Sequence, residues 1–471
     1  MSVEAVLNTE RGLIVAPAGC GKTHLITETL KVKANKPYLV LTHTTAGVSA
    51  LKQRLKRIGV PNTNFVITTI DGWSRRISNM FPTSCNVIAT PDNPRDYYPE
   101  LRLNVNRYIS AGHISEIISS SYSRLLIDEY QDCDSAQHRL ICSLSEYLPT
   151  IIFGDPMQCI FNFGGPMPSW SKDVQSWFPV ICELNTPWRW INAGTPGLGQ
   201  WILNCRSLLI EGKSIDLLSC PEYVQWHQLT NNFQSDSQNQ INTQYQLRNN
   251  HDASDSLLVI GNPYRANLRH NFASSSHGID VVEPVELSDI TSAASTLDNA
   301  DGMGLADSLL TTTTTMMTGV GKARLMQRTS SIIAGRNRTP ATTIELAVKN
   351  VVEHGDKNSI ASLLSCLELN SDTRVYRRGA FSALKDTIYL SISDPTKTMK
   401  QAAEVIREQR RHQGDRRIPQ RAIGSTLLLK GLEADHVLIL DAGDMNSHNL
   451  YVALSRGAKS ITAFSSRSVT P

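Results

Sequence analysis

The chain has 471 residues, enough for roughly two to four compact domains with a sizeable buried core. Hydrophobic residues make up 41% and charged residues 19%, which is the composition of a globular protein and excludes an intrinsically disordered one. The formal net charge of +3 is only mildly basic, so any contact with nucleic acid must come from local patches of the surface.

Nine cysteines are scattered along the chain without a C-x-x-C pair, and no Cys/His spacing indicates a zinc site. We therefore expect free thiols in a reducing compartment. The sequence contains no apolar run of about 18 residues and does not begin with a charged segment followed by an apolar one. These features predict a cytoplasmic protein that does not associate with membranes.

The first 190 residues alternate short apolar runs with helical patterns. The runs that predict strands are Gly12–Ala16, Tyr38–Thr42, Phe65–Ile70, Leu125–Asp128 and Thr150–Asp155. Several of them are apolar throughout, as expected for parallel strands that are covered on both faces. The alternation predicts an α/β domain with a doubly wound parallel sheet.

A second set of strands is predicted later in the chain, at Leu257–Ile260, His436–Leu440 and Ile461–Phe464, and two helical patterns precede the last two of these. We therefore expect a second α/β domain that is assembled from two segments and interrupted by helices. The predicted division is 1–72 and 121–188 for the first domain, 73–120 for its small helical insertion, 189–289 and 396–471 for the second domain, and 290–395 for its reduced helical insertion.

A glycine-rich segment, Ala16-Pro-Ala-Gly-Cys-Gly-Lys-Thr23, follows the first predicted strand and opens a helix. It fits the phosphate-binding pattern G-x-x-x-x-G-K-[ST], with alanine at the first position. Its glycines permit a loop whose N–H groups face an anion, and the helix N-terminus adds a favourable dipole. Lys22 would reach the β and γ phosphates of ATP, and the Thr23 hydroxyl would bind Mg²⁺. The expected nucleotide-binding residues are Ala16, Pro17, Ala18, Gly19, Cys20, Gly21, Lys22, Thr23 and His24.

Two adjacent carboxylates follow the apolar strand in Leu125-Leu-Ile-Asp-Glu-Tyr-Gln-Asp132. Hydrolysis at a phosphate-binding loop needs one carboxylate for the metal ion and a base that orients the attacking water. We assign Asp128 to Mg²⁺ and Glu129 to the base. The alternative is an acidic turn that only caps the strand.

Further motifs narrow the class of protein. In chain order they are Thr42-His-Thr-Thr-Ala-Gly-Val-Ser-Ala-Leu51, Thr68-Thr-Ile-Asp-Gly-Trp73, Gly154-Asp-Pro-Met-Gln-Cys-Ile-Phe161, Trp188-Arg189, Lys430-Gly-Leu-Glu433 and Leu450-Tyr-Val-Ala-Leu-Ser-Arg456. The set resembles the UvrD/Rep-like branch of helicase superfamily 1, most clearly over residues 1–190 and 420–471. The resemblance implies two RecA-like P-loop domains that hydrolyse ATP between them and step along single-stranded DNA, 3′ to 5′.

The resemblance also implies roles for single residues. Gln158 would sense the γ phosphate, and Arg189 and Arg456 would stabilise the transition state. Trp188 would stack on adenine, and Glu433 would contact the nucleotide from the second domain. The rings expected to stack on bases are Phe161 and Phe163, with His43 and Trp73 as weaker candidates, and core packing is the alternative for each ring.

The sequence departs from the family pattern at several positions. No glutamine precedes Gln53, so the usual adenine-reading glutamine is absent from this sequence. Asp71 stands where relatives often carry histidine, Gly164 where they carry an arginine that contacts nucleic acid, and Leu427-Leu428 where they carry His-Ser. These departures favour ATPase chemistry over processive unwinding.

A second hypothesis follows from the short length and the altered strand contacts. The chain would be a nucleotide-switched, DNA-sensing regulatory subunit that works with a nuclease partner protein and unwinds little. Compact relatives of this kind include the helicase-like subunit of anti-phage defence systems of the Gabija type. A self-contained helicase–nuclease is disfavoured, because the sequence shows no additional carboxylate–lysine cluster typical of nucleases.

Overall fold

The computed structural model describes residues 3–91, 93–160, 165–230, 232–284, 287–413 and 419–471. Contacts divide the chain into two compact units. Unit 1 comprises Met1–Trp226, Ala442–Thr462 and Arg467–Pro471, and unit 2 comprises His227–Asp441 and Ala463–Ser466. Residues 189–226 and 442–462 thus pack in unit 1, whereas the sequence-based division groups them with the second domain.

Unit 1 is built on a six-stranded sheet with the order β3-β2-β4-β5-β1-β6, and its described strand pairs are parallel. The strands are β1 Arg11–Val15, β2 Tyr38–Thr42, β3 Phe65–Thr69, β4 Leu125–Ile127, β5 Thr150–Gly154 and β6 Val180–Glu183. The five apolar runs near the N-terminus are therefore confirmed as strands of one parallel sheet. β6, whose side chains are partly exposed, was not predicted.

Both faces of this sheet are covered by helices, as the apolar strands require. Leu13 and Val15 of β1 point into one hydrophobic cluster and Ile14 into another, because successive strand residues face opposite sides. The first cluster is completed by α4 Ile70–Met80, α6 Pro94–Ser110, α7 Ser115–Ser121 and α8 Ser135–Leu144, and the second by α2 Lys22–Lys31 and α3 Thr45–Arg57.

The remaining elements of unit 1 are short or flank the sheet. The α-helices are α1 Val3–Asn8, α5 Pro82–Cys85, α9 Gln175–Trp177, α10 Trp188–Asn192, α11 Pro196–Ile210 and α21 Ser447–Leu454. The other elements are the 3-10 helices η1 Asn62–Asn64, η2 Tyr130–Asp132 and η3 Pro156–Gln158, the π-helix η4 Trp170–Val174, and the antiparallel pair β7 Ile215–Asp216 and β16 Val469–Thr470. Residues 73–120 are largely helical, in keeping with the predicted small insertion.

A second six-stranded sheet has the order β10-β13-β9-β14-β15-β8. Its strands are β8 Val224–Gln228, β9 Leu257–Gly261, β10 Asp280–Val281, β13 Arg421–Ser425, β14 Ala434–Ile439 and β15 Gly457–Ser465. β9 lies between β13 and β14 and is parallel to both, and α12 Phe233–Asn250 and α13 Ala266–Ser275 contribute to the core around it. Two parallel sheets confirm the predicted α/β class and are consistent with two RecA-like domains.

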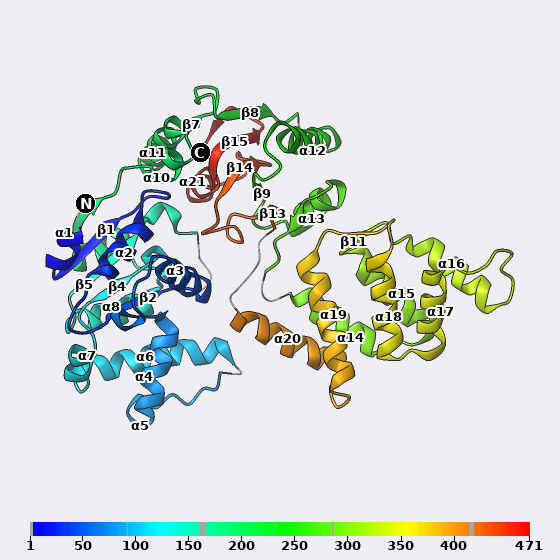
Figure 1. The fold of residues 1–471 in the computed structure, drawn as a ribbon, viewed down its shortest axis with the longest axis horizontal. Helices are drawn as coiled ribbons and strands as arrows, with labels where there is room; N and C mark the ends of the chain where they lie inside the picture. The colour runs from blue at the N-terminus through cyan, green and yellow to red at the C-terminus, as the bar shows by residue number, and fades with distance from the viewer. Residues whose placement is uncertain (1–2, 92, 161–164, 231, 285–286, 414–418) are drawn as a thin grey trace. The chain divides into compact units, whose positions relative to one another are not determined.

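Unit 2 also contains a helical group with its own hydrophobic core (Figure 1). Its members are α14 Ser288–Asp298, α15 Gly302–Thr314, α16 Lys322–Ile333, α17 Thr343–His354, α18 Lys357–Leu369, α19 Arg378–Ser393 and α20 Met399–Gln413, with the antiparallel pair β11 Met317–Thr318 and β12 Arg374–Val375. α20 packs against α14 and α19, so the helical group continues beyond the predicted end at residue 395.

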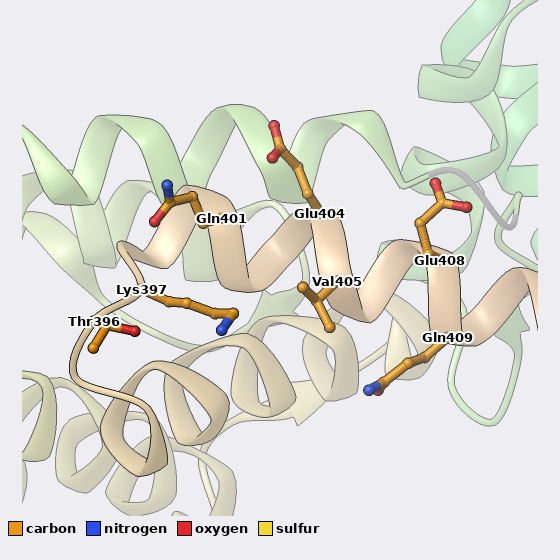
Figure 2. Close-up of a pocket in the computed structure, with 7 residues that line it drawn as sticks. All are labelled: Thr396, Lys397, Gln401, Glu404, Val405, Glu408 and Gln409. Atoms are coloured by element: carbon orange, nitrogen blue, oxygen red, sulfur yellow. The ribbon is translucent and has the colours of Figure 1, made fainter. Parts of the chain in front are cut away.

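An open groove of about 820 Å³ runs beside α20 (Figure 2). Its lining residues are Thr396, Lys397, Gln401, Glu404, Val405, Glu408 and Gln409, of which all but Val405 are of polar or charged type. Among the helices of the described ranges, none combines the length and the apolar character needed to span a membrane.

Candidate nucleotide site

The phosphate-binding loop connects β1 to α2 in unit 1. Gly19 and Gly21 adopt φ values of +70° and +93°, which side chains rarely tolerate, and Gly21 precedes the first residue of α2. The Ala16 N–H donates to the Gly154 carbonyl at 2.9 Å, which fixes the loop against the end of β5. The loop therefore has the strand-before, helix-after context that an anion-binding loop requires.

Lys22 connects this loop to the two carboxylates after β4. Its Nζ atom lies 3.0 Å from Asp128 Oδ1 and 2.5 Å from Glu129 Oε1. The Lys22 and Asp128 side chains are only 12% and 14% exposed, so these charges interact with little screening by water. The structure thus brings together the lysine, the proposed metal ligand and the proposed base.

The environment shifts the proton affinities of this group. Burial alone would lower the pKa of Lys22, but the adjacent Asp128 and Glu129 outweigh it and raise that pKa above its ordinary value. Burial raises the pKa of Asp128, although Lys22 opposes the shift. Lys22 and the two carboxylates neutralise one another in this structure. A phosphate group would replace the carboxylates as the partner of Lys22, and Mg²⁺ would replace Lys22 as the partner of the carboxylates. The Thr23 hydroxyl and the Asp128 carboxylate are oxygen donors of the kind that Mg²⁺ prefers.

Polar contacts hold the base in place. Glu129 adopts a left-handed backbone conformation (φ 56°), and the Gln131 amide donates to its Oε2 at 2.5 Å. The side-chain oxygen Oε1 of Gln131 accepts from the backbone N–H of Asp155 at 3.2 Å, and the Gln158 side-chain amide donates to Asp155 Oδ2 at 3.2 Å. A chain of hydrogen bonds therefore connects Glu129 to Gln158, the predicted γ-phosphate sensor.

Asp155 is fully buried, and its charge is balanced by Arg206 of α11. The guanidinium donates from Nε at 3.1 Å and from Nη2 at 3.0 Å to Asp155 Oδ1, and from Nη1 at 2.5 Å to Glu183. An ionised buried carboxylate needs such a partner. No role in the nucleotide site was predicted from sequence for Gln131, Asp155 or Arg206. The first two lie inside the quoted motifs, whereas Arg206 carries no motif signal.

α10 packs directly against the loop. The Arg189 N–H donates to the Gly19 carbonyl at 3.1 Å, and a Cβ atom at Gly21 would lie 3.0 Å from Cδ1 of Trp188. Trp188 is 50% exposed, so it has an accessible surface beside the loop, as its predicted stacking on adenine requires. Stacking itself remains a prediction.

The last predicted motif also lies near the loop in unit 1. The Tyr451 hydroxyl of α21 accepts from the Ala18 N–H at 3.0 Å, and the Arg189 guanidinium donates to the Ser455 carbonyl. Arg456 is 2% exposed and donates from Nε to the Val452 carbonyl at 2.9 Å. The structure therefore joins the Trp188-Arg189 motif to the 450–456 motif. The proposed action of both arginines on the transition state stays a prediction. The expected contact of Glu433 with the nucleotide also stays a prediction, and Glu433 belongs to unit 2.

The remaining predicted P-loop residues differ in exposure. Cys20 is 3% exposed, and burial, the largest effect, raises the pKa of its thiol to about 12, so it stays protonated. Pro17 is buried, Thr23 is half-buried, and the His24 side chain is 64% exposed, 3.8 Å from Glu28. His24 therefore faces solvent in the first turn of α2.

The residues predicted to stack on nucleic-acid bases differ in burial, and two of them lie outside the described ranges. Phe161 and Phe163 lie outside the described residues. His43 is half-buried between β2 and α3. Trp73 is 1% exposed and packs in the core with Ile70 and Ile77, so its expected role in base stacking is corrected to core packing: its ring offers no accessible face.

Asp71, the departure from the family's histidine, forms part of an ion-pair triad. Arg102 donates to Asp71 Oδ1 at 2.7 Å and Oδ2 at 2.6 Å, and to Asp134 Oδ2 at 2.6 Å. Asp134 also caps α8 by accepting from the backbone of Ala136 and Gln137. Through Arg102, Asp71 therefore joins α4 to α6 and to the start of α8, so its side chain has a structural role in this chain.

Comparisons with known proteins agree with this site. A family model described as an AAA domain matches residues 1–164, which include the phosphate-binding loop and the Asp128-Glu129 pair. Over 193 residues the chain is 25% identical to the Gabija protein GajB of Bacillus cereus (strain VD045). The match covers 33% of this chain and 39% of that relative, so the chain matches less than half of the relative's length.

Residues 1–164 of the chain are thus similar to an AAA domain, and part of the chain is similar to a Gabija protein. The resemblance to superfamily 1 helicases that the motifs indicated is thereby confirmed. A solved structure described as a complex of Arterivirus nonstructural protein 10 (helicase) with DNA aligns with a TM-score of 0.28 and 11% identity, over 54% of this chain and 49% of that one.

Proposed function

We propose that this helicase-like protein is an ATP-dependent translocase of the UvrD type that acts on single-stranded DNA. The observation that carries the proposal is the contact of Lys22 with both Asp128 and Glu129 at a loop of phosphate-binding geometry. Hydrolysis of ATP needs a cation for the phosphates, a metal ligand and a base, and these three groups lie within reach of one another.

In the proposed reaction, Lys22 leaves the carboxylates and binds the β and γ phosphates. Mg²⁺, held by Thr23 and Asp128, would neutralise charge on the phosphates. Glu129, freed from Lys22 but still hydrogen-bonded to Gln131, orients the attacking water and accepts its proton. The water oxygen bonds to the γ phosphorus as the bond from that phosphorus to the β–γ bridging oxygen breaks, and ADP and phosphate leave. Because the Gln131–Asp155–Gln158 chain starts at Glu129, a change at the γ phosphate would be transmitted to the segment after η3, where the family stacks bases.

The test is the rate of ATP hydrolysis with and without a single-stranded DNA oligomer. We expect strong stimulation by the strand, and a loss of about 100-fold or more in Glu129→Gln, since a positioned base contributes about 10²–10⁴-fold. Glu116→Gln, at an exposed position of α7, is the matched control and should hydrolyse like the unaltered protein. Retained binding of a fluorescent ATP analogue by Glu129→Gln would show that the loop is intact.

Hydrolysis that persists in Glu129→Gln would contradict the assignment of the base. Hydrolysis that ignores the strand would contradict the translocase. Unwinding of duplex DNA is measured separately, with a strand-displacement substrate, because translocation does not require it.

A regulatory subunit is the second proposed function. It is favoured by Asp71 and Trp73, because one is held in an ion-pair triad and the other is buried in the core where the family contacts the strand. Its nuclease partner and a role in anti-phage defence are proposed from the similarity to the Gabija protein GajB. This function predicts ATP and DNA binding with little strand stimulation, and stimulation only after the partner is added.

A further inference from the structure

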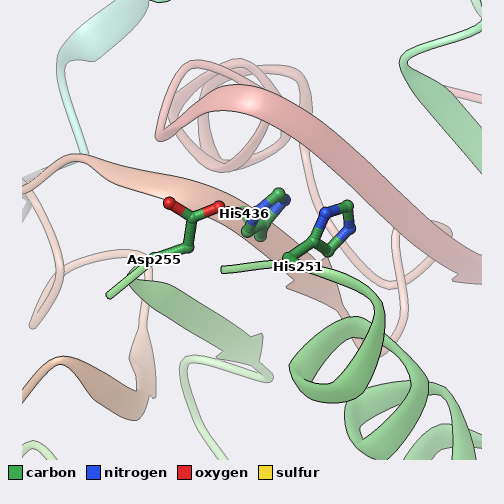
Figure 3. A group of neighbouring side chains, drawn as sticks. All are labelled: His251, Asp255 and His436. Atoms are coloured by element: carbon green, nitrogen blue, oxygen red, sulfur yellow. Dashed lines mark hydrogen bonds and ion pairs between the residues drawn. The ribbon is translucent and has the colours of Figure 1, made fainter. Parts of the chain in front are cut away.

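Two histidines and an aspartate from separate segments of unit 2 meet beside the second sheet (Figure 3). His251 follows the last residue of α12, Asp255 precedes β9, and His436 lies in β14. One nitrogen or oxygen atom of each residue lies within 4.8 Å of those of the other two. His436 Nε2 is 3.0 Å from Asp255 Oδ2, and the two imidazole rings are stacked with centroids 3.7 Å apart.

The surrounding backbone holds this cluster in a defined geometry. Ser256 donates to Asp435 Oδ2 from its N–H at 2.9 Å and its hydroxyl at 2.7 Å, which joins the starts of β9 and β14 next to two members of the cluster. The loop before Asp255 is a tight turn, because Asp252 Oδ1 accepts from both the N–H and the hydroxyl of Ser254. The Gln420 amide donates to the carbonyls of Ala253 and Asp255 and anchors the same loop to the strand beside it.

We propose that His251, Asp255 and His436 form a binding site for a divalent transition-metal ion, with Zn²⁺ as the best match. Two imidazole nitrogens and one carboxylate oxygen are the donor set that such ions favour. Ligands about 2.0–2.1 Å from a tetrahedral zinc lie about 3.3 Å from one another. The His436–Asp255 pair is already near that separation. The lone pairs of imidazole nitrogens lie in the ring planes, so binding requires the exposed His251 ring to rotate out of its stack with His436.

The exposure of the three residues fits an ion that enters from solvent. His436 is 3% exposed, Asp255 is half-buried and His251 is exposed, so the site has a buried floor and an open side. Three protein ligands leave a fourth position for water or for a further ligand. The bound ion would join the end of α12 to the starts of β9 and β14. This site belongs to unit 2 and uses none of the residues assigned to ATP hydrolysis in unit 1.

The experiment uses the full chain without a polyhistidine tag, after removal of metal with a chelator and under reducing conditions. Zn²⁺ binding is measured by calorimetry, and Co²⁺ is used as a spectroscopic probe. We expect one high-affinity ion per chain and visible Co²⁺ bands without thiolate charge-transfer bands. The absence of thiolate bands separates this site from the main competing ligands, which are the thiols of the nine cysteines.

The variants separate the site from adventitious binding. His251→Ala alters only an exposed ligand and should weaken Zn²⁺ binding by at least about 10-fold, as should Asp255→Asn, which keeps the shape of the side chain. His354→Ala, at an exposed histidine of α17, should bind like the unaltered chain. The absence of a stoichiometric site, thiolate bands with Co²⁺, or equal affinity in His251→Ala would each overturn the proposal.

Discussion

The ring of Trp190 lies against the backbone of Gly19, so closely that a Cβ atom at Gly19 would come within 2.8 Å of Cζ3 of the ring. Trp190 is fully buried, and its indole N–H donates to the Gly457 carbonyl at 2.7 Å. The ring therefore cannot turn away without losing a buried hydrogen bond. The backbone at Gly19, the first of the two positive-φ positions of the loop, is thus constrained by α10 as well as by its own sequence.

Gly19→Ala should weaken ATP binding by about 10-fold or more, because strain of about 1.4 kcal/mol in the loop corresponds to that factor. Gly212→Ala is the matched control: Gly212 has the same φ of +70°, but a Cβ atom there would meet nothing within 4 Å. Both substitutions should destabilise the fold by about 1–2 kcal/mol through the backbone alone. Equal ATP affinity in the two variants, measured with a fluorescent analogue, would show that Trp190 does not constrain the loop.

Arg102→Met should lower the free energy of unfolding by about 3 kcal/mol, since it leaves two partly buried carboxylates, Asp71 and Asp134, without their shared cation. The Arg102 side chain is only 13% exposed, so water cannot replace the lost contacts fully. Arg107→Met, on an exposed position of the same helix, should change stability by less than about 0.5 kcal/mol. Urea unfolding of the two variants makes the comparison, and similar midpoints would refute a structural role of the triad.

The free energy of unfolding of unit 2 should decrease as the pH is lowered, because His270 of α13 becomes protonated more readily in the unfolded chain. Burial, aided by Arg377 and Arg269, lowers the pKa of His270 from 6.5 to about 4. The unfolded chain therefore takes up a proton on this residue at a higher pH than the folded one does. The stabilisation is complete above pH 6.5 and is lost as the pH falls from 6.5 towards about 4.

Between about pH 7 and pH 5, the free energy of unfolding of His270→Gln should decrease by about 1–2 kcal/mol less than that of the unaltered chain. Urea unfolding at a series of pH values measures it, and His354→Gln at an exposed position of α17 serves as the control for general charge effects. If His270→Gln and the unaltered chain lose stability equally over this range, His270 is not the group that titrates.

Much of the first sheet was predictable, because each of its central strands is an uninterrupted apolar run and the motifs lie at strand ends. Residues 16–23 and Asp128-Glu129 could be assigned from local pattern for the same reason. The Arg206–Asp155 pair and the His251–Asp255–His436 cluster could not, because their members come from distant segments with no fixed spacing. The choice between base stacking and core packing for Trp73 could not be made from sequence, because an aromatic residue in a motif looks the same there whether its ring is buried or exposed.

The division of the chain was harder to predict than its elements. The sequence separates two α/β patterns, but it does not show which sheet a flanking helix packs against. α10, α11 and α21 contact the first unit, and α20 joins the helical group, because burial of their apolar faces is decided by tertiary packing. The domain boundaries proposed from sequence therefore stay a prediction.

The order of strands in the first sheet also governs when Lys22, Asp128 and Glu129 can come together during synthesis. β1 carries the phosphate-binding loop and β4 the two carboxylates, yet the two strands are not neighbours: β5 lies between them. A ribosome-bound chain that has released Lys22, Asp128 and Glu129 still lacks the strand that sets their separation. A nascent chain therefore cannot bring Lys22 together with Asp128 and Glu129 across this sheet until residues 150–154 have emerged and inserted.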